Sequence, residues 1–170
     1  MLKGKLVNIR WIKNSDLKYI FEWINDPEIQ FFAQEDYPIT FNQWHVRRIY
    51  SDGIKGKRYV FIIEDKTGYV IGELWLYPID LRKKMAELVI VIGRKNFHGR
   101  GYGKDAINTI KKYCFEKLKL EAIYLKVFSF NRKAINCYLS CGFKTIGKGV
   151  KKVLRGDRYF EELIMELRKE

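Results

Sequence analysis

Two hydrophobic periods alternate along this chain. Apolar residues recur at every second position in some stretches, as in half-buried strands, and at every third or fourth position in others, as in amphipathic helices. The expected strands span residues 5–12, 58–65, 69–78, 85–93, 122–130, 145–154 and 159–167, and the expected helices span residues 16–25, 41–50, 106–118 and 131–142. The pattern predicts an α/β domain with the order β-α-α-β-β-β-α-β-α-β-β.

Local signals mark the ends of these elements. The expected caps and turns lie at Asn14 or Ser15, Thr40, Gly68, Asn131 and Gly142. The first helix is expected to end at Asp26-Pro27, because proline disfavours the helical conformation in the residue before it. The apolar centre of the strand at 85–93 is unbroken, which predicts that this strand is buried on both faces.

Length and composition support one globular domain over residues 1–170. The chain has 170 residues, of which 47% are hydrophobic and 15% aromatic, enough for a sizeable core. No apolar run approaches the roughly 20 residues that a membrane span needs. The first ten residues lack the apolar centre of a signal peptide, and three cysteines argue against a disulfide framework. These features predict a cytoplasmic protein without a membrane partner.

The net charge of +13 is unevenly distributed. Residues 1–85 hold 14 Lys and Arg against 11 Asp and Glu, whereas residues 86–170 hold 19 against 9. A basic half favours a polyanionic partner, either a phosphate-bearing cofactor or a nucleic acid. A soluble basic surface without such a partner is the alternative.

Glycine occupies alternate positions from residue 99 to residue 103, directly before an expected helix. The stretch is not a P-loop, since Lys104 is followed by Asp105 rather than a hydroxyl, and the spacing is not that of a dinucleotide fingerprint. Because glycines have no side chain, they can instead leave main-chain N–H groups exposed to one anion. The N-terminus of the following helix adds positive charge to such a site. With Arg100 beside it, this loop predicts a pyrophosphate site that needs no metal. A glycine-rich turn without a ligand is the alternative.

A second group of residues follows one β-α unit later. Asn131, Ala134, Tyr138, Gly142 and Phe143 form the pattern N-x-x-A-x-x-x-Y-x-x-x-G-F. Spacings of three and four place the first three along one side of a helix, where the small Ala134 lets a ligand lie close. Tyr138 is either a core aromatic or a catalyst. Cys137 and Cys141 lack companions at metal-ligand spacing and are interpreted as packing residues.

These two motifs resemble the GNAT N-acetyltransferases over about residues 85–145, the expected cofactor-binding core. The family signature Q/R-x-x-G-x-G/A is matched by residues 98–103 except at its first position, His98. The segment "WINDPEI" and the length resemble the branch with spermidine and ribosomal-protein N-terminal acetyltransferases. The resemblance implies an α+β fold with a mixed, mostly antiparallel central sheet of about seven strands, flanked by helices and splayed between strands 86–92 and 122–128. It is also compatible with a homodimer.

The resemblance implies acetyl-CoA as the cosubstrate and no metal. The cofactor-binding residues that it implies are Ile90, Val91, Ile92, His98, Gly99, Arg100, Gly101, Tyr102, Gly103, Lys104 and Asn131. The pyrophosphate would bind the N–H groups of residues 100–104, and the pantetheine arm would pair with residues 90–92 and Asn131. One N–H of that strand would polarise the thioester carbonyl. His98 would donate a hydrogen bond, with a catalytic role as the alternative.

The reaction that the resemblance implies is transfer of the acetyl group to a primary amine of a small molecule or a protein N-terminus. Tyr138 resembles the family's general acid, which gives a proton to the departing thiolate. Glu87 is the candidate base, acting through water, or the anchor of a cationic acceptor. A solvent-facing strand carboxylate is the alternative for Glu87.

Two other function classes remain open at this stage. A nucleic-acid-binding module would use the basic segment at 148–160, which otherwise forms a hairpin, and a CoA-binding relative could have lost catalysis. The acceptor is also open between a polyamine, an amino-sugar, an aminoglycoside and a protein N-terminus. The acidic residues that could attract it, or form a solvated rim, are Glu22, Asp26, Glu28, Glu35 and Asp36. Trp23 and Trp44 lie on the helices expected to roof the acceptor site.

Overall fold

The strands form one sheet in the computed structural model, which describes residues 1–169. The strands are β1 (Leu2–Lys3), β2 (Val7–Trp11), β3 (Tyr59–Asp65), β4 (Val70–Asp80), β5 (Met85–Val91), β6 (Ala122–Phe128), β7 (Lys144–Arg155) and β8 (Arg158–Arg168). Their order in the sheet is β1-β2-β3-β4-β5-β6-β8-β7, and only β5 and β6 are parallel. The mostly antiparallel mixed sheet is confirmed, with the two-residue β1 as an additional strand.

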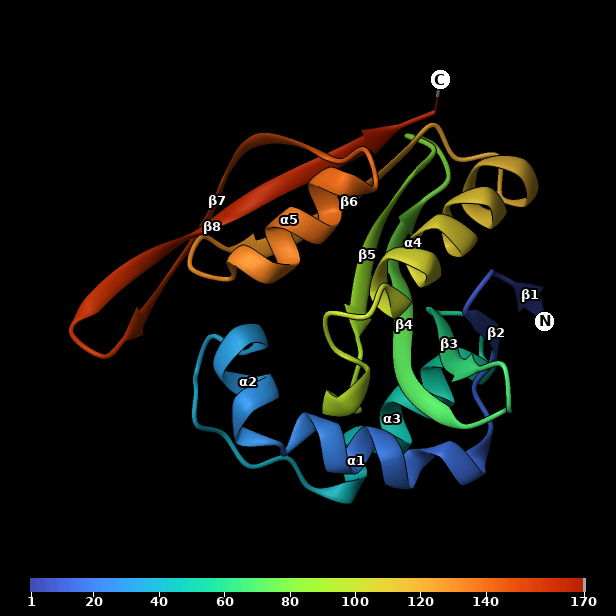
Figure 1. The fold of residues 1–170 in the computed structure, drawn as a ribbon, viewed down its shortest axis with the longest axis horizontal. Coiled ribbons are helices and arrows are strands. Elements are labelled where there is room, and N and C mark those ends of the chain that lie inside the picture. Colours follow the sequence, from blue (N-terminus) through green and yellow to red (C-terminus); the bar gives the residue numbers. More distant parts are fainter. Residues whose placement is uncertain (170) are drawn as a thin grey trace.

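Helices cover both faces of this sheet (Figure 1). They are α1 (Leu17–Ile24), α2 (Pro27–Ala33), α3 (Gln43–Ile54), α4 (Tyr102–Lys112) and α5 (Arg132–Ser140), with a π-helical turn at Tyr113–Lys117 after α4. Successive residues of β3 enter different cores: Phe61 packs in the cluster with α4, and Ile62 packs in the cluster with α1 and α3. The alternating pattern that predicted β3 therefore arises because its side chains point in turn to the two faces of the sheet. In the described residues, no helix is long and apolar enough to span a bilayer.

The short helix α2 is absent from the sequence prediction. Asp26 was expected only to end a helix, but its carboxylate accepts hydrogen bonds from the N–H groups of Glu28 at 2.9 Å and Ile29 at 3.1 Å. Pro27 occupies the first helical position, where its missing N–H costs nothing. Asp26-Pro27 therefore begins a helix directly after α1 has ended.

Two expected caps are wrong. Neither Asn14 nor Ser15 caps α1, because both belong to a 3₁₀ turn at Asn14–Asp16. The cap of α3 is Asn42 rather than Thr40, since the Asn42 side chain accepts from the N–H of Trp44 at 3.0 Å. The later signals are confirmed: Asn131 caps α5, and the left-handed Gly142 ends it.

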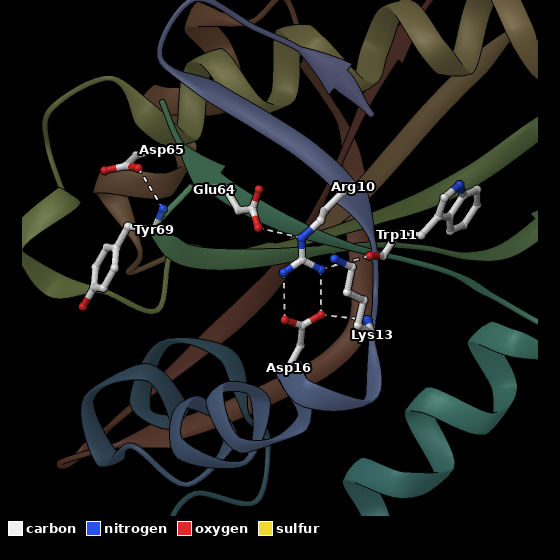
Figure 2. A network of polar contacts seen from close by, with 7 residues as sticks. All are labelled: Arg10, Trp11, Lys13, Asp16, Glu64, Asp65 and Tyr69. Carbon is white, nitrogen blue, oxygen red and sulfur yellow. Dashed lines mark hydrogen bonds and ion pairs between the residues drawn. The ribbon is translucent and has the colours of Figure 1, made fainter. Parts of the chain in front are cut away.

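A network of polar contacts fixes the start of α1 against the sheet (Figure 2). Arg10 of β2 donates to both oxygens of Asp16, at 2.7 and 2.8 Å, and its Nε donates to Glu64 of β3 at 2.6 Å. Hydrogen bonding to Asp16 raises the pKa of the Arg10 guanidinium despite its burial. Asp16 also accepts from the N–H of Lys13 at 2.7 Å, so one buried carboxylate joins the strand to the helix.

The second half of β5 is not buried on both faces, contrary to the prediction from its apolar run. Ala86 and Leu88 are buried, but Val89 is 37% exposed. The reason is the neighbouring strand: β5 pairs with β6 only from Met85 to Glu87. Beyond Glu87 the two strands separate, which confirms the predicted splay, and apolar side chains there line open space.

Candidate active site

The separation of β5 and β6 leaves one side of β5 without a strand partner. The last paired residues are Glu87 and Tyr124, whereas β5 continues to Val91 and β6 to Phe128. On its other side β5 stays paired with β4, up to the pair of Val91 with Glu73. Main-chain groups that face the gap can therefore pair with an extended ligand.

The glycine loop ends at this gap and begins α4. Gly99 and Gly101 have φ angles of +70° and +87°, a left-handed conformation that side chains disfavour. Gly103 lies inside α4, and a Cβ there would stand 3.7 Å from Ile92 and 3.9 Å from Cys137. The left-handed backbone conformation therefore accounts for Gly99 and Gly101. Gly103 instead leaves the space beside Ile92 and Cys137 free of a side chain.

A cavity of about 560 Å³ lies between the glycine loop, α5 and α2, and is called the loop cavity below. Most of the predicted cofactor-binding residues line it: Ile90, Val91, Ile92, His98, Gly99, Gly101, Gly103, Lys104 and Asn131. Tyr138 lines it as well. Arg100 and Tyr102 do not. The Arg100 guanidinium instead donates to the Asn96 carbonyl at 3.1 Å and lies over the ring of Phe97.

The first N–H groups of α4 point out of the helix without a helical acceptor. The ladder begins with the N–H of Asp105, which donates to the carbonyl of Gly101 at 2.9 Å. The N–H groups of residues 102–104 precede it and carry the positive end of the helix dipole. Together with Lys104, which lines the cavity, these groups are suited to bind an anion.

Asp105 stands at the position where a P-loop has a hydroxyl, and its role here is structural. Its carboxylate accepts hydrogen bonds from the N–H groups of Lys5 at 3.1 Å, Leu6 at 2.7 Å and Val7 at 3.0 Å. It therefore ties the turn between β1 and β2 to the first turn of α4. This carboxylate supports the loop and does not line the loop cavity.

His98 binds the chain itself. Its Nε2 lies 2.6 Å from the carbonyl oxygen of Ile92, and because a carbonyl only accepts, Nε2 carries the hydrogen. The imidazole thereby fixes the loop to the end of β5. From the sequence, His98 was expected to donate a hydrogen bond to a ligand. Because Nε2 is engaged by Ile92, only Nδ1 is left for a ligand.

Asn131 has one end of its amide free. Its Oδ1 accepts from the N–H of Ala134 at 3.2 Å, as a helix cap does. Among residues 1–169 its amide NH₂ has no hydrogen-bond acceptor, and the residue lines the loop cavity. A donor is thus available on the side of the cavity opposite β5.

A second cavity, of about 260 Å³, lies beyond the gap between β5, β6 and β8 and is called the strand cavity below. Tyr138 of α5 lines both cavities. Burial raises the pKa of the Tyr138 phenol, with smaller contributions from Cys137 and Cys141, so this hydroxyl is protonated at neutral pH. Tyr138 therefore presents a protonated hydroxyl where the two cavities meet.

Glu87 lies in the strand cavity rather than in solvent. Its carboxylate is largely buried and pairs with the ammonium of Lys126 on β6 at 3.2 Å. The structure therefore places it beyond Tyr138, on the side away from the glycine loop. The alternative of a solvated strand carboxylate does not fit this burial.

The helices expected to roof the acceptor site, α1 and α3, contribute no residue to either cavity. Trp23 is 1% exposed and packs against Gly93, where any Cβ would strike the indole, so Trp23 is a core residue. Trp44 is 61% exposed on α3 and lines neither cavity. The residues that cover the cavities come from the unpredicted α2, where Phe32 and Ala33 line both.

Most of the acidic residues considered for the acceptor are already paired. Glu22 pairs with Arg94 at 3.2 Å, and Glu35 pairs with Lys151 at 2.7 Å. Asp26 and Glu28 share Lys95, at 3.0 and 2.9 Å. The attraction that these carboxylates could exert on a cationic acceptor is therefore largely compensated by neighbouring bases.

Sequence reasoning missed several residues of the two cavities. Lys95 and Lys133 line the loop cavity, and Lys126, Lys151 and Glu162 line the strand cavity. None occupies a specified position of a motif, and only the tertiary arrangement reveals them. Within residues 1–169 no cluster of three or more His, Cys, Asp or Glu side chains is arranged for a metal ion.

The chain is similar to known proteins over most of its length. Residues 7–144 match the family model of the acetyltransferase (GNAT) domain. Acetyltransferase PseH from Campylobacter jejuni (strain 81-176) is 30% identical over 137 residues, which cover 79% of this chain and 80% of that protein.

Solved structures share the fold over nearly the whole chain. A spermidine N-acetyltransferase from Vibrio cholerae, in complex with CoA and spermine, superposes with a TM-score of 0.86 and 26% identity, covering 97% of this chain and 96% of that chain. A dodecameric structure of spermidine N-acetyltransferase from the same organism superposes with a TM-score of 0.79 and 25% identity, covering 97% and 95%.

Proposed function

Because this chain belongs to the GNAT acetyltransferase family, we propose that it transfers the acetyl group of acetyl-CoA directly to a primary amine, with Tyr138 as the general acid. The observation that carries this proposal is the position of Tyr138 in the shared wall of the two cavities. One cavity has the anion-binding loop, and the other has the buried carboxylates. The phenol is thus next to both reactants if each occupies one chamber.

The loop cavity fits acetyl-CoA in three respects. The N–H groups of residues 102–104 and the Lys104 side chain offer positive charge to the pyrophosphate. The unpaired side of β5 offers main-chain groups to the amide-bearing arm, and Asn131 offers a free amide NH₂ opposite. When bound, acetyl-CoA supplies the acetyl group as a reactive thioester. The remaining chemistry belongs to the protein side chains.

Tyr138 balances the protons of the transfer. The amine nitrogen forms a bond to the acetyl carbon while the carbon–sulfur bond breaks, so the sulfur needs one proton and the nitrogen must lose one. A phenol alone is too weak an acid to protonate a free thiolate, since its reference pKa is about 10 and that of a thiol is about 8.5. We infer that Tyr138 donates as the bond breaks and is reprotonated by the proton that the nitrogen releases.

Glu87 serves the amine in one of two ways. As a base acting through water, it removes a proton from the ammonium form of the acceptor; as an anchor, it binds that ammonium in competition with Lys126. Glu87→Gln separates the two roles. Loss of the acidic limb of the kcat/KM profile supports the base, and a raised acceptor KM with an unchanged profile supports the anchor.

The test of the proposed function is release of free CoA thiol with a panel of amines: spermidine, glucosamine, kanamycin and a peptide with a free N-terminus. Tyr138→Phe is expected to lower kcat by about 10²-fold or more, while calorimetry shows unchanged acetyl-CoA affinity. Tyr113→Phe is the matched control, because Tyr113 is a half-buried tyrosine outside both cavities. Turnover of Tyr138→Phe equal to the wild type would remove the phenol from the mechanism. The molar mass in solution tests the homodimer.

A further inference from the structure

One carboxylate of the strand cavity has no partner. Glu162 of β8 is 6% exposed and lines the cavity with Glu87, Lys126 and Lys151. Glu87 is paired with Lys126 at 3.2 Å, and Lys151 is paired with Glu35 at 2.7 Å. Among the residues that the structure describes, the Glu162 side chain accepts no hydrogen bond and forms no ion pair. Lys151 acts on Glu162 only at longer range, because its ammonium is paired with Glu35, so the Glu162 carboxylate has no direct partner in the cavity.

The neighbouring strand makes room for this carboxylate. A Cβ at Gly149 of β7 would overlap the Glu162 carboxylate, standing 2.8 Å from its carbon Cδ. The register of β7 against β8 also shifts between Lys148 and Lys152, so the strand bulges around this glycine. Burying a charge without a partner is costly, which means that a ligand able to supply the partner gains binding energy there.

We propose that Glu162 binds a second hydrogen-bond donor of the acceptor, a hydroxyl or an ammonium group other than the reacting nitrogen. The proposal rests on the proposed function, since it takes the strand cavity as the acceptor site. A carboxylate next to an amine favours the protonated form. Because the reacting nitrogen must be neutral to attack, Glu162 suits a group that does not react.

The walls around Glu162 fit the carbon chain of such an acceptor. Phe32, Val89 and Phe128 line the same cavity, and its volume of about 260 Å³ leaves room only for a small segment. Apolar walls with a few placed polar groups are typical of specific small-molecule sites. The acceptor class is therefore a short primary amine with a second donor, either a diamine or an amino alcohol.

Three amines with the same three-carbon chain test this proposal: propylamine, 3-aminopropan-1-ol and 1,3-diaminopropane. The measurement is kcat/KM from CoA thiol release. The wild type is expected to prefer both bifunctional amines over propylamine by about tenfold or more, as expected for hydrogen bonds to a charged group. Glu162→Gln is expected to reduce that preference to about threefold or less through the acceptor KM. The diamine should lose more than the amino alcohol, because its ammonium loses an ion pair as well as a hydrogen bond to a charged acceptor.

Two matched controls are available in the same hairpin. Glu161→Gln changes the adjacent carboxylate, which is paired with Lys148 at 2.7 Å outside both cavities. Gly149→Ala should displace the Glu162 carboxylate and reproduce the loss of preference. Gly147→Ala should not, because a Cβ there meets nothing within 4 Å. Acetyl-CoA calorimetry and thermal unfolding identify any variant that fails to fold.

The outcomes separate the two proposals. Transfer to all three amines without a preference, or with the same preference in Glu162→Gln and Glu161→Gln, overturns the role of Glu162 alone. A kcat loss in Glu162→Gln that is equal for the three amines also overturns it, since that result is expected of a general base. Absence of thiol release with these amines and with the panel above overturns the proposed function and this inference together.

Discussion

Replacing Glu73 by glutamine tests whether burial keeps this carboxyl group protonated beside the candidate active site. Glu73 is 5% exposed on β4, opposite Val91 of β5, and its Oε2 accepts a hydrogen bond from the indole of Trp75 at 2.8 Å. Burial raises the pKa of Glu73 to about 7, and the indole hydrogen bond opposes that rise. Glutamine keeps the shape and the acceptor of this bond but cannot ionise.

The sign of the effect follows from which state holds the proton. The unfolded chain releases it near the ordinary pKa of 4.5, whereas the folded protein keeps it until about 7. Between these values the folded state binds more protons, so stability falls as pH rises. At 1.36 kcal/mol per pKa unit, the loss is about 3 kcal/mol once pH exceeds 7. Glu73→Gln is therefore expected to exceed the wild type in stability by about 3 kcal/mol at pH 8 and to match it near pH 4.5.

Urea unfolding of both proteins at pH 5 and pH 8 measures this difference. The other ionisable groups are common to both chains, so their contributions cancel in the comparison. A gap between variant and wild type that is the same at both pH values would refute the reasoning. Trp75→Phe extends the test, because removing the indole donor should raise the pKa of Glu73 further and move the loss of stability to higher pH.

Further predictions concern the elements that build the loop cavity. Gly101→Ala should cost about 1–2 kcal/mol in thermal or urea unfolding because its φ is left-handed, whereas Gly103→Ala, inside α4, should cost less and act mainly on acetyl-CoA affinity measured by calorimetry. Asp26→Ala removes the cap of α2, should cost about 1 kcal/mol and should raise the acetyl-CoA KM; an unchanged KM would separate α2 from the site. Asp105→Ala leaves three main-chain N–H groups without their acceptor and should lower stability by about 1–3 kcal/mol, measured by urea unfolding.

Elements with a strong local period were predictable, and those set by one short signal were not. The alternation in β3 and the spacing of Ala106, Ile107 and Ile110 in α4 are properties of consecutive residues, so the pattern alone locates them. Helix α2 has seven residues and no clear period. Asp26-Pro27, where α2 starts, is also a valid stop signal for the preceding helix. Whether a new helix follows depends on whether the chain can continue against the sheet.

The same distinction divides the candidate active site. The loop cavity is built by two motifs on consecutive β-α units, and the parallel pairing of β5 with β6 brings them together. Its position could therefore be inferred from order and spacing. The strand cavity depends on where β5 and β6 stop pairing and on how the hairpin meets α2. That meeting is made by Arg155, which donates to the Phe31 carbonyl at 2.9 Å, and by the ion pair of Lys151 with Glu35. No short segment encodes either contact.

Two pairs of identical residues in the β7–β8 hairpin show why a short segment does not predict the strand cavity. Glu161 and Glu162 are adjacent carboxylates, but because successive residues of a strand face opposite sides, one pairs with Lys148 at the surface and the other is buried in the strand cavity. Gly147 and Gly149 lie two residues apart on β7, but only the second packs against that buried carboxylate, where the register shifts. A shift of one residue in the hairpin would exchange the two glutamates. Acceptor selectivity is therefore expected to respond to the register of β7 and β8, whereas acetyl-CoA binding responds to the glycine loop.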